Sequence, residues 1–245
     1  MHAYLMLEDT SFVQLGERCV IGRGHSCGLR IFSSRASREH CHVRRDGERW
    51  LLQDLGSSGG TWLMALKQRI GSPYALSNGD RFAPGTTIVT YLLRTVPLES
   101  DATRALEAVV AEDPSRGAAW DAYADALTER NDPLGARISA PPVRPELSLQ
   151  EHLAGADFRW SHGHICEATL VDSMKLTALL ASRLSRLMVS LTVHGDGTQA
   201  TAQRIAEALA QSRLPALRTL TLHGWHEAVA VTMPASPRLG VRRLG

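Results

Sequence analysis

The chain lacks several features that would place it in a membrane or outside the cell. None of its 245 residues belongs to an apolar run of 18, so no membrane-spanning helix is predicted. The first ten residues include Glu8 and Asp9 and show no basic start followed by a long apolar stretch, which argues against a secretory signal. The four cysteines have no C-x-x-C spacing, so reduced thiols are expected. Together these absences predict a cytoplasmic protein with no membrane partner.

A strong charge of either sign is also missing, because the formal net charge is only +2. Residues 1–97 hold 12 Lys and Arg against 8 Asp and Glu, whereas the remainder holds 15 against 17. The mildly basic first part suits an anionic ligand. It is too weakly basic to predict nucleic-acid binding, which usually needs a strongly basic face.

Motifs of catalysis are absent as well, since the chain contains no G-x-S-x-G elbow, P-loop or kinase motif. Two groups have the spacing of metal ligands: His25, Cys27, His40, Cys41 and His42, and farther along His162 and His164. On a strand, His40 and His42 would share one face and Cys41 would point the other way. The second group has no third ligand. We therefore expect structural histidines, with no metal, no cofactor and no catalytic residue.

Short strand-like runs, separated by Gly, Ser or Asn turns, fill the first 95 residues. They are residues 3–8, 11–15, 19–21, 29–31, 40–44, 50–53, 61–63, 67–70, 81–83 and 87–94. Many short strands with frequent turn residues are typical of an all-β sandwich. Asn78-Gly79 predicts a hairpin with a type I′ turn. Trp50 and Trp62 are interpreted as packing residues.

Four loop motifs lie in this region, about 15 to 20 residues apart. They are Gly22-Arg23, Ser37-Arg38-Glu39-His40, Asp54-Leu55-Gly56-Ser57-Ser58-Gly59-Gly60-Thr61 and Asn78-Gly79-Asp80. Their order and spacing resemble the forkhead-associated (FHA) domain, a β-sandwich that reads phosphothreonine. The resemblance covers residues 1–97 and implies a binding module, not an enzyme.

The residue types in these motifs fit the chemistry of a phosphate. A phosphorylated threonine carries about −1.5 to −2 charge and three acceptor oxygens. Arg23 offers a guanidinium, Ser37 and Ser58 offer hydroxyls, and loop glycines let backbone N–H groups approach a ligand. The resemblance implies phosphopeptide contacts at Arg23, Ser37, Arg38, Ser58 and Gly59. It implies architectural roles for Gly22, His40, Asp54, Gly56, Gly60 and Thr61.

Gly59 departs from the FHA pattern. The family usually has Asn at this position, and that side chain hydrogen-bonds the peptide backbone beside the phosphorylated residue. Losing such a bond costs about 1–2 kcal/mol, or roughly tenfold in affinity. The family's Asn-Gly after the following strand is replaced by Ala65-Leu66. Arg35 is expected near the site, where its side chain could compensate.

Residues 98–145 read as a short helical module. Ser100 or Asp101 is expected to cap a helix that contains Leu106, Val109 and Val110 and ends at Asp113-Pro114. A second amphipathic helix follows with apolar side chains at Ala119, Trp120, Tyr123, Ala124 and Leu127, ended by Asn131-Asp132-Pro133. The segment resembles a helical module that accompanies leucine-rich-type repeats in bacterial proteins. The alternative interpretation of this segment is a single tetratricopeptide repeat. Three prolines in residues 140–145 indicate a spacer.

Residues 146–245 contain an internal repeat. The motif Ser182-Arg183-Leu184 followed by residues 191–195 recurs as Ser212-Arg213-Leu214 followed by residues 220–224. A helical pattern around Ile205 and Leu209 lies between the copies. A strand plus a helix every 28 to 30 residues is the signature of a leucine-rich repeat. We therefore expect an α/β solenoid fragment of about two and a half repeats, and a multidomain protein overall.

These features favour a phosphothreonine-dependent adaptor in bacterial Ser/Thr kinase signalling. The amino-terminal domain would bind a kinase or its substrate, and the carboxy-terminal repeats would bind a second protein. The alternative is a phosphorylation-independent scaffold with a degenerate FHA site. Gly59 favours the scaffold, whereas Arg23 and Ser37 favour the adaptor. A catalytic carboxy-terminal domain is the remaining alternative.

Overall fold

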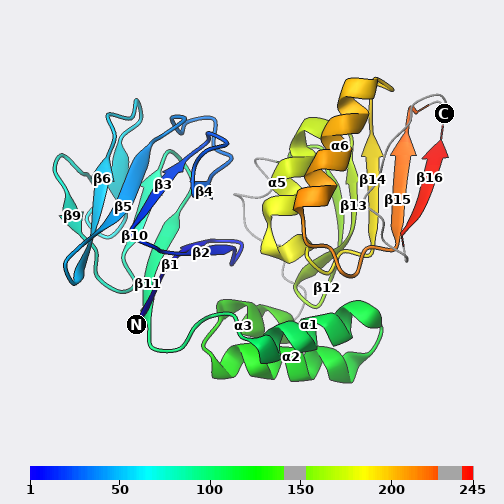
Figure 1. Ribbon diagram of the computed structural model, residues 1–245, viewed down its shortest axis with the longest axis horizontal. Helices are drawn as coiled ribbons and strands as arrows, with labels where there is room; N and C mark the ends of the chain where they lie inside the picture. Colours follow the sequence, from blue (N-terminus) through cyan, green and yellow to red (C-terminus); the bar gives the residue numbers. More distant parts are fainter. Residues whose placement is uncertain (141–152, 226–238, 245) are drawn as a thin grey trace. The chain divides into compact units, whose positions relative to one another are not determined.

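The computed structural model describes residues 1–140, 153–225 and 239–244 (Figure 1). The chain divides into two compact units, and the boundary along the chain falls between Pro97 and Leu98. Each unit is described by itself below.

The first unit is a sandwich of two β-sheets (Figure 1). Its strands are β1 (His2–Leu7), β2 (Phe12–Gln14), β3 (Arg18–Gly22), β4 (Leu29–Arg30), β5 (Cys41–Asp46), β6 (Arg49–Asp54), β7 (Thr61–Leu63), β8 (Gln68–Arg69), β9 (Tyr74–Ala75), β10 (Arg81–Pro84) and β11 (Val89–Arg94). One sheet has the order β2-β1-β11-β10-β7-β8, and the other has the order β4-β3-β5-β6-β9. The predicted sandwich is confirmed.

The sandwich core comes from side chains that both sheets turn inward. Leu5 on β1 pairs with Tyr91 on β11, and both are buried. From the other sheet, Ile21, Val43 and Leu52 are fully buried in the same hydrophobic cluster. Burying a side chain of this size stabilises the fold by about 1.5–3 kcal/mol. This core holds the strand ends that carry the loop motifs.

Two sequence predictions in this unit are wrong. Residues 77–80 form a turn closed by the Asp80 N–H to the Ser77 carbonyl at 3.0 Å, but only Gly79 has a positive φ, of 90°. Type I′ needs positive φ at both central residues, so the turn is not of that type. The chain passes there from β9 in one sheet to β10 in the other, so no hairpin forms. Trp50 packs in the core as expected, but Trp62 is 43% exposed.

The second unit begins with three helices. They are α1 (Asp101–Glu112), α2 (Gly117–Glu129) and α3 (Pro133–Ser139). Ser100 caps α1, and its hydroxyl accepts the Thr103 N–H while the Thr103 side chain accepts the Ser100 N–H. Helix α2 buries all five apolar positions that its periodicity predicted. The helix boundaries expected at Asp113 and Asn131 agree with the structure to within two residues.

A mixed sheet forms the rest of the second unit. Its strands and helices are β12 (Asp157–Ser161), β13 (His164–Leu170), η1 (Ser173–Lys175), α5 (Leu176–Ala181), η2 (Arg183–Ser185), β14 (Ser190–His194), α6 (Gln199–Gln211), β15 (Thr219–His223) and β16 (Gly240–Leu244). The order is β12-β13-β14-β15-β16, with β12 antiparallel to β13 and the other pairs parallel. Helices α5 and α6 lie against this sheet (Figure 1).

The internal repeat coincides with adjacent strands. Residues 190–194 of β14 pair in parallel with residues 219–223 of β15, so the two copies lie side by side in register. Neighbouring pairs have other offsets: Glu167 pairs with Ser190, and Thr219 pairs with Gly240. The structure is therefore an α/β region with a parallel core, and assignment to a leucine-rich solenoid remains a proposal.

The helices and the sheet of the second unit share one hydrophobic core. The β12–β13 hairpin tip packs on the helices, with the His162 ring stacked on Trp120 at 4.6 Å between centroids. A Cβ on Gly163 would lie 2.6 Å from the Arg137 carbonyl oxygen, so this close approach requires glycine. The predicted proline spacer and the boundary at 145/146 fall in residues 141–152, outside the described residues. The three-part domain division stays a prediction.

A buried ion pair ties α3 to η2. The Arg183 guanidinium reaches both carboxylate oxygens of Asp132, at 2.9 and 2.8 Å, and both side chains are at most 4% exposed. Asp132 also caps α3 by accepting the Leu134 N–H at 3.0 Å. The carboxylate therefore neutralises a cation and closes a helix end at once.

No helix among the described residues is both long enough and apolar enough to cross a membrane.

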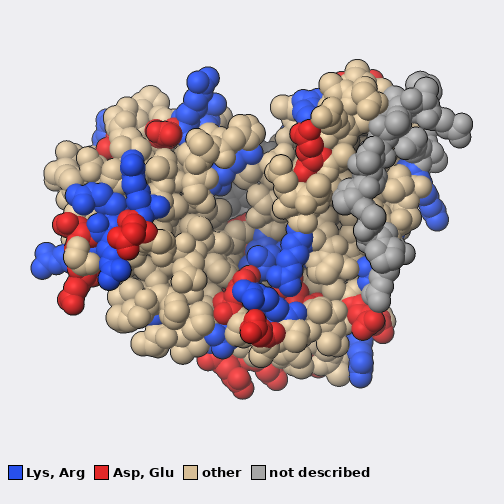
Figure 2. Space-filling view, viewed as in Figure 1, with Lys and Arg blue, Asp and Glu red and all other residues tan. Residues whose placement is uncertain are grey.

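The face seen in Figure 2 carries Lys and Arg side chains intermixed with Asp and Glu, as the small net charge leads one to expect. Any local excess of charge must therefore be sought in particular loops.

Candidate functional site

Three loops of the first unit hold the residues that the sequence singled out. They run through residues 23–28, 31–40 and 55–60, and we call them the site loops. The Arg23 N–H donates to the Ser37 carbonyl at 3.1 Å, and the Gly24 N–H donates to the Arg38 carbonyl at 2.9 Å. A Cβ on Gly22 would lie 2.2 Å from the Arg38 carbonyl oxygen. Only glycine lets the first two loops come this close.

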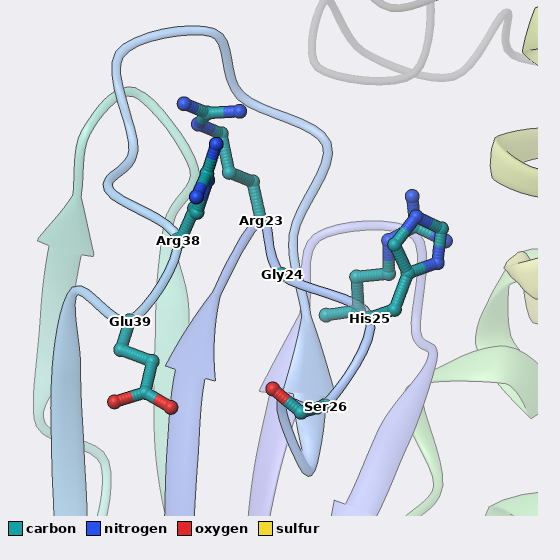
Figure 3. A pocket seen from close by; sticks show the side chains of 7 residues that line it. Arg23, Gly24, His25, Ser26, Arg38 and Glu39 are labelled. Carbon is teal, nitrogen blue, oxygen red and sulfur yellow. The ribbon is translucent and has the colours of Figure 1, made fainter.

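Arg23 is exposed, and its side chain is held at one nitrogen only. Its Nε donates to the Ala36 carbonyl at 2.9 Å. Among the described residues, the two terminal nitrogens of the guanidinium have no partner and are left for a ligand. Arg38 is exposed as well, and the Arg23 and Arg38 side chains point in the same direction, whereas Glu39 points the opposite way (Figure 3). The carboxylate is thus turned away from the two cations.

Ser37 and Ser58 join the second and third site loops. The Ser58 N–H donates to the Ser37 hydroxyl oxygen at 3.4 Å. That oxygen is the acceptor, and the Ser37 O–H has no acceptor of its own among the described residues, so its proton is available to a ligand. Ser58 is exposed and Ser37 is half-buried. The structure therefore places both hydroxyls at the same edge of the sandwich as Arg23.

The buried His40 ring connects the second and third site loops. It is fully buried, Nδ1 accepts the Ser37 N–H at 3.0 Å, and Nε2 lies 3.1 Å from the Gly60 carbonyl oxygen. A ring that accepts at Nδ1 and donates at Nε2 is a neutral imidazole with its proton on Nε2. Both nitrogens are occupied, so His40 has no capacity left for a metal or for proton transfer.

Asp54 organises the third site loop. Its Oδ1 accepts the Ser57 and Thr61 hydroxyls at 2.6 and 2.7 Å, and its Oδ2 accepts the Ser57 N–H at 2.9 Å. Burial raises the pKa of the Asp54 carboxyl, but the hydrogen bonds from Ser57 and Thr61 outweigh it and hold the pKa below its usual range. Gly56 completes the loop with a φ of 73°.

Gly59 and Gly60 end the third site loop under different constraints. Gly60 has a φ of 70°, and a Cβ there would lie 2.1 Å from the Arg69 Nε. Gly59 has no positive φ, and a Cβ there would meet only the Arg35 carbonyl oxygen, at 3.4 Å. The side chain that the FHA pattern has at position 59 is therefore missing although there is space for it.

Two residues at this edge were not singled out as site residues. The Arg69 guanidinium donates to the Ser57 carbonyl at 3.3 Å, and the Trp62 indole N–H donates to the Gly59 carbonyl at 3.2 Å. Both side chains lie on paired strands, where Trp62 faces Arg69. The exposed Trp62 thus supports the site loop and does not pack in the core. Cross-strand pairing was the signal that places them together, and it cannot be read from spacing alone.

The cysteines and histidines form no reactive centre among the residues that the structure describes. No group of three or more His, Cys, Asp or Glu side chains there is arranged to hold a metal ion. All four cysteines are free, and burial raises the pKa of the Cys19 thiol to about 11. Such a thiol stays protonated and is a poor nucleophile near neutral pH.

The first unit matches a known family. The sequence model of the FHA domain matches residues 19–85. A structure of the FhaA FHA domain complexed with the intracellular domain of Rv3910 is 30% identical, with a TM-score of 0.34, over 36% of this chain and 98% of that one. A structure from work on phosphothreonine-dependent FHA domain interactions is 28% identical, with a TM-score of 0.36, over 39% of this chain and 100% of that one.

A third similar structure is Mycobacterium tuberculosis EmbR in complex with a low-affinity phosphopeptide, 26% identical with a TM-score of 0.37, over 39% of this chain and 25% of that one. The comparison with curated proteins returned no match. The 30% identical FHA domain is covered over 98% of its length. Through its first unit, the chain belongs to the FHA-domain family.

Proposed function

We propose that the first unit binds phosphothreonine on a partner protein and that the chain serves as an adaptor. The observation that carries the proposal is the convergence of Arg23, Ser37 and Ser58 at one edge, with guanidinium nitrogens and a hydroxyl proton uncommitted. A phosphate with three acceptor oxygens matches these donors, and a charge-assisted hydrogen bond contributes roughly 1.5–3 kcal/mol.

The site is preorganised for this task. His40 and Asp54 are fully engaged in holding the site loops, so ligand binding does not have to order them. Arg38 adds a second exposed guanidinium. A fixed loop edge on a rigid sandwich lowers the entropic cost of binding.

Gly59 weakens the anchoring of the peptide backbone. We therefore expect phosphothreonine peptides to bind in the micromolar range, about −7 to −8 kcal/mol. Calorimetry on the full chain with phosphorylated and unphosphorylated forms of one peptide tests the proposal. Binding of the phosphorylated form alone supports a reader, and equal affinity for both forms leaves only the phosphorylation-independent scaffold.

The setting of this activity is part of the proposal. The partner is a Ser/Thr kinase or its substrate in a bacterial cytoplasm, and the second unit binds another protein. The parallel strands β14 and β15, which repeat one sequence motif in register, support a leucine-rich-repeat-like surface for that contact. The helices α1 and α2 lie where the sequence predicts the repeat-companion module. No cofactor, nucleic acid or membrane has a role.

A further inference from the structure

The first unit has a surface hollow that begins at Arg23 and Arg38 and continues to residues that the proposed phosphothreonine contacts do not use. Its volume is about 910 Å³. It is lined by Arg23, Gly24, His25, Ser26, Arg30, Arg38 and Glu39. The lining holds three guanidinium groups and one carboxylate, so it carries a net positive charge before His25 is counted. Glu39 and Ser26 lie at the end of the view away from the tips of Arg23 and Arg38 (Figure 3).

The hollow extends from Arg23 and Arg38 toward strand β4, away from Ser58. The sheet order is β4-β3-β5-β6, and Arg30 belongs to the edge strand β4. Ser58 follows β6, on the far side of β5. Arg23 follows β3 and Arg38 precedes β5, so these two arginines lie between Arg30 and Ser58 in the strand order. One anion at Arg23, Ser37 and Ser58 therefore leaves the β4 side open.

Arg30 has no counter-ion among the described residues. Its guanidinium carbon lies 4.8 Å from the centre of the Phe32 ring, and its buried Nε has no hydrogen-bond partner. Among the described residues, the ion pairs of the first unit engage Arg44, Arg45 and Arg81 with carboxylates and leave out Arg23, Arg30 and Arg38. A buried, unpaired donor is costly, and a bound anion would relieve that cost.

The spacing suits a second group on the same peptide. Gly22, which precedes Arg23, pairs with Arg30 on the neighbouring strand. Adjacent strands lie about 4.8 Å apart. Three residues of extended chain span about 10 Å, so a peptide fixed by its phosphothreonine reaches the hollow within three residues.

We infer that this hollow is a second anion subsite, in which Arg30 and His25 bind a negatively charged side chain within three residues of the phosphothreonine. The inference rests on the proposed function, because it needs the first phosphate to fix the peptide. Its ligand class is a peptide with two anionic groups. A second phosphate carries up to two charges and a carboxylate carries one, so the phosphorylated neighbour is the better ligand.

Calorimetry on the full chain with three peptide sets tests the subsite. The first peptide carries one phosphothreonine with neutral flanks. The second set adds phosphoserine at each position from −3 to +3, and the third adds glutamate at the same positions. We expect one position at which phosphoserine raises the affinity about tenfold and glutamate raises it less. An equal gain from glutamate would assign the subsite to acidic residues.

Arg30→Gln is the decisive variant. Arg49→Gln is its control, because Arg49 is the first residue of β6 and lies at the opposite end of that strand from the third site loop. We expect Arg30→Gln to abolish the gain from the second phosphate and to leave binding of the singly phosphorylated peptide unchanged. Arg30→Lys should keep part of the gain, which separates charge from local folding. Arg49→Gln should change neither peptide.

Two results would overturn the subsite. One is equal affinity for singly and doubly phosphorylated peptides at every position. The other is a gain that survives in Arg30→Gln, which would put the second phosphate elsewhere. Either result leaves the proposed function standing as long as the singly phosphorylated peptide binds better than its unphosphorylated form. Loss of that difference would remove the reader hypothesis itself.

Discussion

In the first unit, Arg23, Arg30 and Arg38 border one open hollow without an ion pair among the described residues. In the second unit, Arg183 is 4% exposed and spans both oxygens of Asp132. All of these residues are arginines, but those of the first unit keep donors for a ligand and Arg183 uses its donors within the fold. A guanidinium whose fork is already filled by a buried carboxylate stabilises a fold. One held at a single nitrogen, or stacked on a ring, keeps donors for a ligand.

The histidines show the same contrast. His40 in the first unit uses both ring nitrogens to hold the site loops. His164 in the second unit is buried beside Trp120, and burial lowers its pKa to about 4. The first serves the geometry of a binding edge, whereas the second makes the packing of helices on the sheet sensitive to acid.

The largest expected effect comes from breaking the buried pair. Arg183→Leu should destabilise the second unit by about 3–5 kcal/mol, because it leaves the Asp132 carboxylate buried and uncompensated. Urea denaturation of the full chain measures the loss. Arg159→Leu is the matched control, since the Arg159–Glu167 pair is exposed on both sides and should cost under about 1 kcal/mol. Equal costs for the two variants would contradict the contrast.

Acid should weaken the second unit through His164. The unfolded chain protonates this residue near its ordinary pKa of 6.5, but the folded chain resists protonation down to about 4. The stability that the neutral ring provides is therefore complete above pH 6.5 and is lost as the pH falls to about 4, by up to about 3 kcal/mol. Urea midpoints at pH 7.5 and 4.5 measure the slope. A His164→Phe variant with an equally steep slope would show that other groups cause it.

Arg23→Ala should weaken binding of a phosphothreonine peptide roughly tenfold to a hundredfold, because it removes a charge-assisted bond of about 1.5–3 kcal/mol. Arg23 is exposed, so the urea midpoint should hardly move. Calorimetry and denaturation on the same variant separate the two effects. Arg23→Lys should be intermediate, since it keeps the charge without the fork. An Arg23→Ala chain that unfolds would make the residue structural.

Gly59→Asn should give the smallest effect, a gain of about 1 kcal/mol or fivefold in peptide affinity. Position 59 has no positive φ, and a Cβ there meets only the Arg35 carbonyl oxygen at 3.4 Å, so the side chain can be added with little strain. Gly59→Ala controls for the added Cβ, and circular dichroism checks the fold. No gain in a folded variant would favour the scaffold.

Local sequence patterns predicted most of the secondary structure. Short strand-like runs between turn residues located ten of the eleven strands of the sandwich, and the spacing of Trp120, Tyr123 and Leu127 located α2. The two-residue strand β9 was missed because Tyr74-Ala75 carries too little pattern. The turn at residues 77–80 was misread because Asn78-Gly79 is equally compatible with a turn that changes sheets.

The sequence by itself determined the sandwich, the loop motifs and the gap at Gly59, because these depend on neighbours along the chain. Only the tertiary structure decided that Trp62 and Arg69 support the third site loop, that Arg30 has no counter-ion in the described part of the chain and that Arg183 has one in Asp132. Each of these outcomes depends on which strands and helices lie next to one another in the folded chain. The distance to an opposite charge and the degree of burial decide whether a charged side chain is neutralised within the fold or remains able to bind a ligand. Neither quantity can be read from the order of residues along the chain.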